Sequence, residues 1–226
     1  MDEILKYFKS SIGKKQVVAA TGLALILFVV AHLAGNLIVY LGPDAFNAYA
    51  KKLAGLRPGL YFAEVGLAGV FLIHMWFTAL IVLENINARP KRYSVMHVSE
   101  KRSVAAQLMP YTGTIVLAFV IWHLLDFTFI DKHGIRSVMM NGQSYGLYGV
   151  LHTSFANPVH SCLYIIAMAA VGLHLSHGVQ SFCQTFGFGS PKFTPVIRCF
   201  SDWFALLVFI AYGTLPVYIM FNYYTF

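Results

Sequence analysis

Four histidines lie inside long apolar runs of this 226-residue chain, and imidazole is a side chain that can bind a metal or carry a proton. An ionisable side chain within a membrane segment costs free energy and is therefore a functional candidate by default. One such histidine alone is more often a core residue that is hydrogen-bonded to a neighbouring helix. Four of them, one in each of the first four runs, indicate a shared role: His32, His74, His123 and His174.

The composition places these runs in a membrane. Hydrophobic residues make up 58% of the chain and charged residues 11%, and the mean hydropathy is +0.66. A soluble domain carries roughly 25% charged residues. The net charge of +7 would suggest nucleic-acid binding in a soluble protein, but here we expect it to reflect loop lysines and arginines that set membrane orientation. No nucleic-acid partner is expected.

Five runs are long enough to cross the hydrocarbon core as helices. Glycine and proline punctuate the ends of the first four. We therefore predict an all-α integral membrane protein, a single domain over residues 1–226 built as a five-helix bundle. The first outer loop, 42–59, is predicted to hold a short interfacial helix, and the second, 131–158, is long enough to be functional. The predicted spans are 16–41, 59–85, 105–130, 158–186 and 200–222.

The basic residues predict which way the spans point. With the N-terminus inside, the inner segments carry eleven lysines and arginines and the outer loops five, so the N-terminus is expected in the cytoplasm and the C-terminus outside. The inner set is Lys6, Lys9, Lys14, Lys15, Arg89, Lys91, Arg92, Lys101, Arg102, Lys192 and Arg198. The outer set is Lys51, Lys52, Arg57, Lys132 and Arg136.

The four histidines divide into two depths. His32 and His123 lie roughly 16 and 18 residues from the inner ends of spans one and three, which at about 1.5 Å per residue puts them in the outer half. His74 and His174 lie about as far from the outer ends of spans two and four, towards the inner half. Ligation of a b-type haem by two histidines needs one imidazole on each side of the porphyrin. Two pairs at two depths predict two haem b groups that span the bilayer.

Other metal sites fit the histidines less well. Zinc or copper needs three or four ligands that converge on one point, whereas these histidines divide two and two. His177 follows His174 by three residues, but no carboxylate accompanies the pair, and we predict a packing or hydrogen-bonding role for it. The remaining histidines are expected to be solvated or interfacial: His97, His133, His152 and His160.

A Thr-Gly pair precedes both outer histidines by the same interval. Thr21-Gly22 lies eleven residues before His32, and Thr112-Gly113 lies eleven before His123. Eleven residues turn a helix to within about 20° of whole turns, so each threonine shares the face of its histidine about 16 Å below it. Both pairs are then level with the inner haem, where glycine allows a macrocycle or a helix to approach closely. Ordinary small-residue packing is the alternative.

The sequence resembles the membrane-anchor cytochrome b of succinate:quinone and fumarate:quinol oxidoreductases, in the single-chain, five-helix, two-haem form. The resemblance covers about residues 10–225, and the order of its segments together with the histidine pattern is specific. The segments are SIGKKQVVAATGLALILFVVAHLAGNL (11–37), GPDAFNAYAKKL (42–53), FLIHMWF (71–77), TGTIVLAFVIWHLLDF (112–127) and GLHLSHGVQSFCQTFG (172–187).

The resemblance implies that His74 and His174 bind the inner haem and that His32 and His123 bind the outer one. It also implies a prokaryotic cytoplasmic membrane, menaquinone as the quinone, and two soluble subunits docked on the inner face. One of these would carry covalent FAD at the dicarboxylate site and the other three iron–sulfur clusters. This chain shows no sequence signal for flavin or cluster binding.

Two family glutamates are missing. Gly172 stands where some fumarate reductases of this type have a glutamate two residues before the haem histidine, and Ala54 stands where the family's quinol-site glutamate aligns. The first absence favours succinate oxidation over fumarate reduction. Quinone reduction needs two protons as well as two electrons, so proton-exchanging groups near the outer haem are the candidates. They are Asp126 first, then Glu64, Asp44 and Lys52.

Two other functions stay open at this point. A cytochrome b anchor of another quinone-linked complex, such as a formate dehydrogenase or nitrate reductase gamma subunit, would also carry histidines on its helices, although not the quoted segments. A transporter with a histidine relay would carry no haem.

Overall fold

The computed structural model describes residues 2–88, 104–139 and 141–222, where the chain is helical and contains no β-strand. Five helical segments in this part are long and apolar enough to cross a membrane, which confirms the predicted number. They are Ser11–Leu41, Gly59–Asn87, Val104–Thr128, Pro158–Thr185 and Thr194–Asn222. Six of the residues interpreted above lie outside the described ranges: Arg89, Lys91, Arg92, His97, Lys101 and Arg102.

Two predicted spans begin too late. Helix α2 (Ser11–Leu37) starts five residues before the predicted 16, because the Ser10 hydroxyl caps it by accepting the Gly13 N–H at 3.0 Å. Helix α8 (Thr194–Asn222) starts at Thr194, where 200 was predicted. Hydropathy marks only the part of a helix that lies in hydrocarbon, whereas both helices extend beyond it through polar and basic residues.

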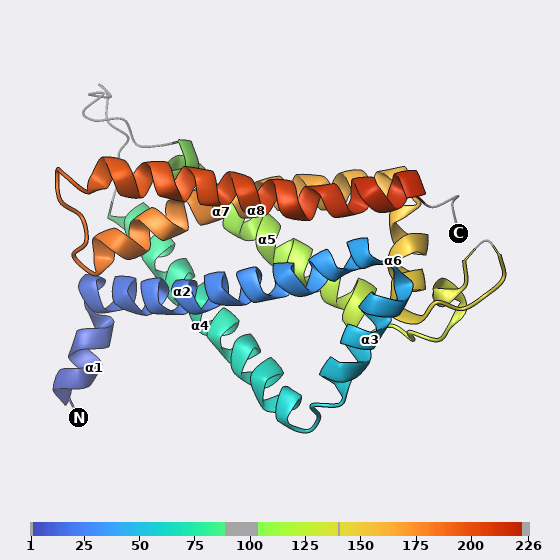
Figure 1. Cartoon of the computed structure of the whole chain (residues 1–226). Coiled ribbons are helices and arrows are strands. Elements are labelled where there is room, and N and C mark those ends of the chain that lie inside the picture. The colour runs from blue at the N-terminus through green and yellow to red at the C-terminus, as the bar shows by residue number, and fades with distance from the viewer. Residues whose placement is uncertain (1, 89–103, 140, 223–226) are drawn as a thin grey trace.

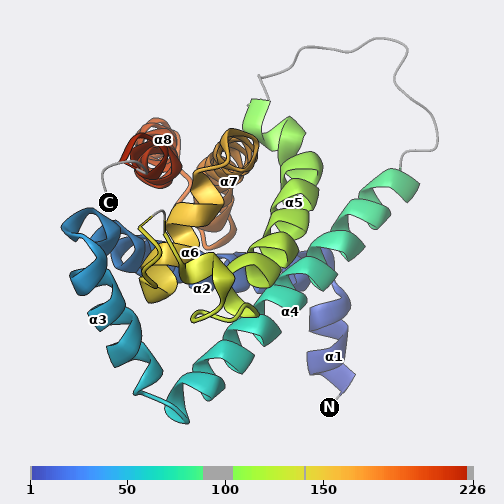
Figure 2. The same ribbon diagram turned by 90° about the vertical axis from the view of Figure 1, so that its right-hand side faces the viewer.

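Helices α7 (Pro158–Thr185) and α8 run side by side along the bundle, as Figures 1 and 2 both show. Helix α5 (Val104–His123) packs on α7, and α4 (Gly59–Asn87) packs on α2, which in turn contacts α7. No residue of α4 is buried. The bundle therefore consists of two helix pairs, α2 with α4 and α5 with α7, together with α8.

An ion pair ties the inner ends of α2 and α4 together. Lys14 donates to the Glu84 carboxylate, and Lys14 is 9% exposed. The short helix α1 (Asp2–Lys9) lies before this end of α2 and turns away from it (Figure 1). The pair fixes the register of α2 against α4 at the inner end.

The two loops predicted to be outer pack together into a cap over one end of the bundle, which we call the outer end from this prediction. The first holds α3 (Pro43–Ala54), which confirms the predicted short helix, and the second holds α6 (Gly146–Phe155). Asn47 of α3 joins them, because its Nδ2 donates to the Tyr145 carbonyl at 2.7 Å and its Oδ1 accepts the Tyr148 N–H at 3.2 Å. Apolar side chains of the cap pack against those of the bundle in one buried cluster, which includes Val39, Phe46, Tyr148, Phe155 and Ile219.

The prediction that His152 is solvated or interfacial was wrong. His152 lies on α6 and is 0% exposed, with its ring stacked on Tyr148 at 4.3 Å between centroids. His152 is buried because α6 packs on α3 and α7, and no local sequence pattern predicts this packing. Burial lowers the pKa of His152 to about 4 and raises the pKa of Tyr148 to about 12. His133, by contrast, is exposed as predicted.

We expect the cap to lose stability as the pH falls from about 6.5 towards 4. His152 then stays neutral in the folded cap while the unfolded loop takes up a proton, so protonation favours unfolding in that window. The thermal midpoint of the purified protein at pH 7 and pH 5 measures the effect. His152→Phe keeps the stacked ring and should reduce the pH dependence, whereas His133→Phe should not. An equal fall in thermal midpoint between pH 7 and pH 5 in the wild type and both variants would show that His152 is not the group responsible.

Candidate functional site

The two histidines predicted to form the outer pair meet between α2 and α5. The ring centroids of His32 and His123 are 5.9 Å apart and the two ring planes are 84° to one another. Phe28 stacks on His32 at 5.3 Å, and Phe119 lies 5.6 Å from His123. The His123 Nδ1 is buried and has no hydrogen-bond partner among the described residues. This part of the structure therefore brings together two imidazoles, one of which has a buried nitrogen without a hydrogen-bond partner.

The inner histidines each contact one of the repeated threonines. The Thr21 Oγ1 lies 3.1 Å from the His74 Nδ1, and the Thr112 Oγ1 lies 3.2 Å from the His174 Nδ1. His174 is also within electrostatic range of His74. The two Thr-Gly pairs thus make the same contact with a histidine in the structure, one where α2 packs on α4 and the other where α5 packs on α7. The sequence did not reveal these threonine–histidine contacts.

The glycines of the repeat lie against the same two rings. A Cβ at Gly22 would stand 3.3 Å from the His74 Cε1, and a Cβ at Gly113 would stand 3.5 Å from the His174 Cε1. A Cβ at Gly22 would require the His74 ring to shift slightly, whereas a Cβ at Gly113 would just contact the His174 ring. Gly22 and Gly113 allow the helix backbone to approach a histidine ring closely.

The donor set fits haem b better than a bare metal ion. Nowhere in the described part of the chain do three metal-ligating side chains of histidine, cysteine, aspartate or glutamate converge. Axial ligation by two histidines needs only one imidazole on each face of the macrocycle. The facing imidazoles of His32 and His123 and the glycine-lined rings of His74 and His174 suit residues that hold such a group.

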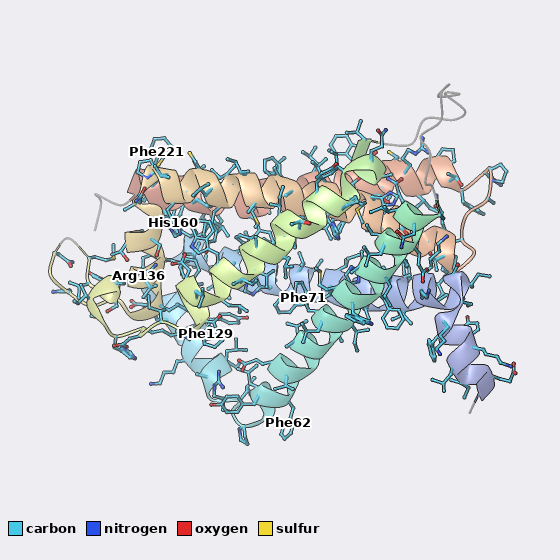
Figure 3. All side chains as sticks on the ribbon, turned by 180° about the vertical axis from the view of Figure 1, so that it is seen from behind. Phe62, Phe71, Phe129, Arg136, His160 and Phe221 are labelled. Atoms are coloured by element: carbon cyan, nitrogen blue, oxygen red, sulfur yellow. The ribbon has the colours of Figure 1, made fainter. Side chains whose placement is uncertain are left out.

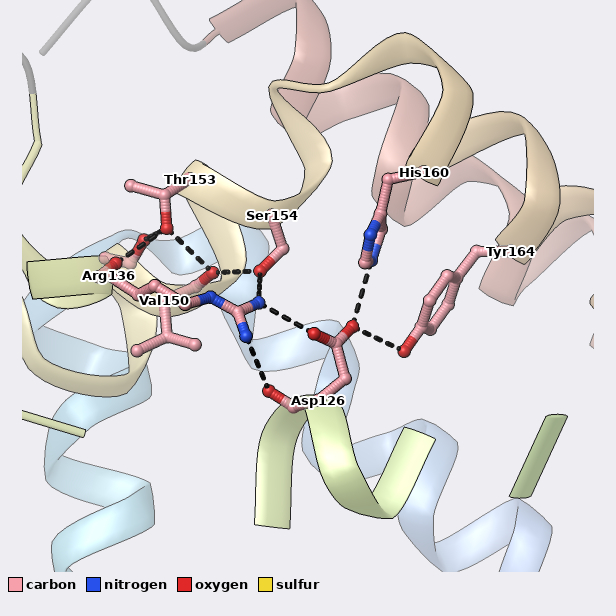
Figure 4. Close-up of polar contacts among 8 residues, drawn as sticks. Asp126, Arg136, Val150, Thr153, Ser154, His160 and Tyr164 are labelled. Carbon is pink, nitrogen blue, oxygen red and sulfur yellow. Dashed lines mark hydrogen bonds and ion pairs between the residues drawn. The ribbon is translucent and has the colours of Figure 1, made fainter. Parts of the chain in front are cut away.

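A polar cluster lies one turn beyond His123. The chain there forms a π-helix over Leu124–Thr128, labelled η2, and Asp126 within it is 7% exposed. Single π-turns in an α-helix are frequent at functional sites. The Asp126 carboxylate accepts hydrogen bonds from the Arg136 Nη2 at 2.7 Å and the Tyr164 hydroxyl at 2.9 Å, and the His160 Nε2 lies 3.0 Å from it (Figure 4).

Three separate segments build this cluster. Arg136 comes from the 3₁₀ turn η3 (Ile135–Ser137) and also donates to the Ser154 hydroxyl of α6. His160 and Tyr164 come from the first turns of α7, four residues apart, with rings stacked at 4.8 Å. Figure 3 shows Arg136 and His160 at the same end of the bundle. The cluster joins the cap to α5 and α7 beside the outer histidines.

The prediction that His160 is solvated or interfacial was wrong, because its side chain is 17% exposed and faces Asp126. The i, i+4 spacing of His160 and Tyr164 could have placed both on one helix face. No signal in the sequence links Arg136 to Asp126, since a loop separates them. These three residues extend the candidate site beyond Asp126.

The other proton-exchanging candidates lie apart from Asp126. Glu64 pairs with the Arg57 Nη2 at 3.1 Å near the outer end of α4. Asp44 lies in the first turn of α3 and Lys52 in its last, where Lys52 is exposed. None of the three bonds to Asp126 in the described structure, so the fold does not gather the four candidates into one site.

Comparison with known proteins supports one family. The chain is 25% identical to the succinate dehydrogenase cytochrome b558 subunit of Bacillus subtilis (strain 168) over 185 residues, which cover 82% of this chain and 83% of that protein. The resemblance to a cytochrome b membrane anchor of succinate dehydrogenase is thereby confirmed. No family model and no solved structure matches the chain. The five membrane-length helices agree with a membrane subunit.

We expect Arg136→Gln to destabilise the outer end of the bundle by about 3 kcal/mol, because it leaves a buried carboxylate without its cation. Thermal unfolding in detergent should show a drop of several degrees in Tm. Lys132→Gln, in the same loop but exposed, is the matched control and should leave Tm within a degree or so of the parent. Equal Tm values for the two variants would show that the Asp126–Arg136 pair contributes nothing.

Proposed function

We propose that this chain is the diheme cytochrome b anchor of a succinate dehydrogenase and passes electrons from an iron–sulfur subunit to quinone in the membrane. The observation that carries the proposal is the contact of His32 with His123 in a chain with five membrane-length helices, with His74 and His174 each held by a threonine of a neighbouring helix. The similarity to a succinate dehydrogenase cytochrome b558 subunit supports the same complex.

His74 and His174 would hold the inner haem b, and His32 and His123 the outer one. Each haem, when bound, takes up and releases one electron. The chain's own residues set the positions of the two haems. Thr21, which contacts His74, and His32 lie eleven residues apart on α2, and this spacing separates the inner from the outer level by about 16 Å. The helices thereby fix the distance between the two histidine levels, and the surrounding apolar side chains exclude water.

The partners would dock on the inner face. With the N-terminus in the cytoplasm of a prokaryote and the C-terminus outside, the basic residues of the inner segments face a flavoprotein subunit with covalent FAD and an iron–sulfur subunit. The whole chain, 1–226, acts as one membrane domain. Dicarboxylate chemistry takes place in the flavoprotein, in the direction of succinate oxidation.

The quinone, which we take to be menaquinone, would be reduced beside the Asp126 cluster. Asp126 and His160 lie within hydrogen-bonding distance of each other and close to His123, so a proton source adjoins the outer electron donor. Tyr164 and Arg136 hold the Asp126 carboxylate in place. Glu64, Asp44 and Lys52 stay second candidates at the outer surface. Lipid covers the apolar outside of the bundle.

Haem content tests the proposal directly. The complex isolated with its partners should give a reduced-minus-oxidised spectrum of b-type cytochromes and about two haems per chain by pyridine hemochrome assay. His74→Leu should remove the inner haem and leave the other, because one axial ligand is lost. His133→Leu, an exposed loop histidine, should retain both. A wild-type complex without b-type absorbance would refute the proposal, and an unchanged haem content in His74→Leu would refute the pairing.

Replacing His160 tests the quinone site. His160→Gln should lower succinate-driven menaquinone reduction at least about 10-fold, because loss of a positioned proton-exchanging group typically costs that much or more. Succinate oxidation with an artificial dye that takes electrons from the soluble subunits should stay normal, as should the haem spectrum. Glu64→Gln tests the alternative location of the quinone site, at the outer end of α4. A quinone-specific defect in Glu64→Gln alone would move the site to α4.

A further inference from the structure

We infer that Thr21 and Thr112 are positioning residues for the inner haem: each accepts a hydrogen bond from the Nδ1–H of one axial histidine and thereby sets the tautomer, the ring orientation and the donor strength of that ligand. The inference rests on the proposed function, since it concerns the ligands of the proposed inner haem.

The direction of each hydrogen bond follows from where the threonine proton goes. A threonine hydroxyl has one proton and two lone pairs. The Thr21 hydroxyl donates to the Val17 carbonyl at 2.7 Å, and the Thr112 hydroxyl donates to the Leu108 or Met109 carbonyl, each at 3.2 Å. With its proton used within its own helix, each hydroxyl can only accept from the histidine. The Nδ1 of His74 and of His174 is therefore the protonated nitrogen, and Nε2 carries the lone pair that binds iron.

The glycine beside each threonine makes the hydrogen bond possible. The close approach of Gly22 to the His74 ring and of Gly113 to the His174 ring brings the helix backbone, and with it the neighbouring hydroxyl, within reach of Nδ1. Thr-Gly therefore acts as one unit, in which the threonine supplies the acceptor and the glycine supplies the room. The same unit occurs on two helices that carry no inner ligand themselves.

His123 of the outer pair lacks this arrangement. Its Nδ1 has no hydrogen-bond partner in the described part of the chain. A hydrogen-bonded Nδ1–H makes an imidazole a stronger donor to its metal and favours the oxidised iron. The two threonines should thus lower the reduction potential of the inner haem and leave that of the outer haem unchanged.

The two inner ligands are not equally dependent on their threonines. Thr112 is the partner found for the His174 Nδ1 among the described residues, and Thr21, the partner of the His74 Nδ1, is only partly buried. Thr112 is 4% exposed, so water has little access to replace its hydroxyl. Removing the Thr112 hydroxyl should consequently have the larger effect.

The test is an optical redox titration of both haems in the complete complex, with low-temperature EPR of the oxidised haems as a second readout of the axial ligands. Thr112→Val should shift the potential of one haem to a more positive value and change its EPR signal, while the other haem keeps both. Thr21→Val should shift the same haem in the same direction by less. Thr112→Ser retains the hydroxyl and should restore the wild-type potential.

Thr114→Val is the matched control. Thr114 lies two residues from Thr112 on α5, its hydroxyl donates to the Pro110 carbonyl at 2.9 Å, and its side chain is exposed. Its replacement removes the same kind of hydroxyl and should move neither potential.

Three outcomes would overturn the inference: unmoved potentials in both valine variants with haem retained, shifts of two different haems, or a shift in Thr114→Val as large as in Thr112→Val. If Thr112→Val loses the inner haem, haem content becomes the readout, and Thr112→Ser must retain it; loss in both variants would also overturn the inference. A wild-type complex without b-type absorbance would instead refute the proposed function itself.

Discussion

Burying imidazoles in an apolar helix bundle is the constraint on which the rest of this structure depends. A histidine ring has two nitrogens, and neither can be left without a partner in the membrane interior at low cost. The inner histidines meet this requirement at Nδ1 through threonine hydroxyls on neighbouring helices. The helix pairs α2 with α4 and α5 with α7 are thus joined by polar contacts within an otherwise apolar interior, which is the kind of contact that holds membrane helices in register.

The repeated Thr-Gly pair links this constraint to the proposed function. Each of α2 and α5 carries an outer histidine and, three turns below it, the hydroxyl that contacts an inner histidine of the partner helix. One helix therefore positions groups at both levels. Because the spacing along an α-helix is rigid, the distance between the two levels is set by the backbone and does not depend on the loops.

The outer end of the bundle follows a different principle. There a charged cluster around Asp126 is buried beneath a cap made of α3 and α6, and its members come from α5, η3 and α7. A buried carboxylate is tolerated only when cations and hydroxyl groups compensate it. Arg136 and Tyr164 provide that compensation, so the cap and the proposed quinone site form one unit.

The sequence by itself determined the membrane class and the number of spans, and it predicted the division of the histidines into an outer and an inner level. Those features depend on local quantities, namely hydropathy over about 20 residues and the fixed rise of a helix. Only the tertiary structure decided which side chains meet: the contact of Thr112 with His174, the burial of His152, and the joining of Arg136 and His160 to Asp126. These contacts link residues between 10 and 62 positions apart, and no local pattern specifies how α6 and η3 fold back onto the helices. Helix propensity and hydropathy decide where a segment lies, whereas packing between segments decides what it touches.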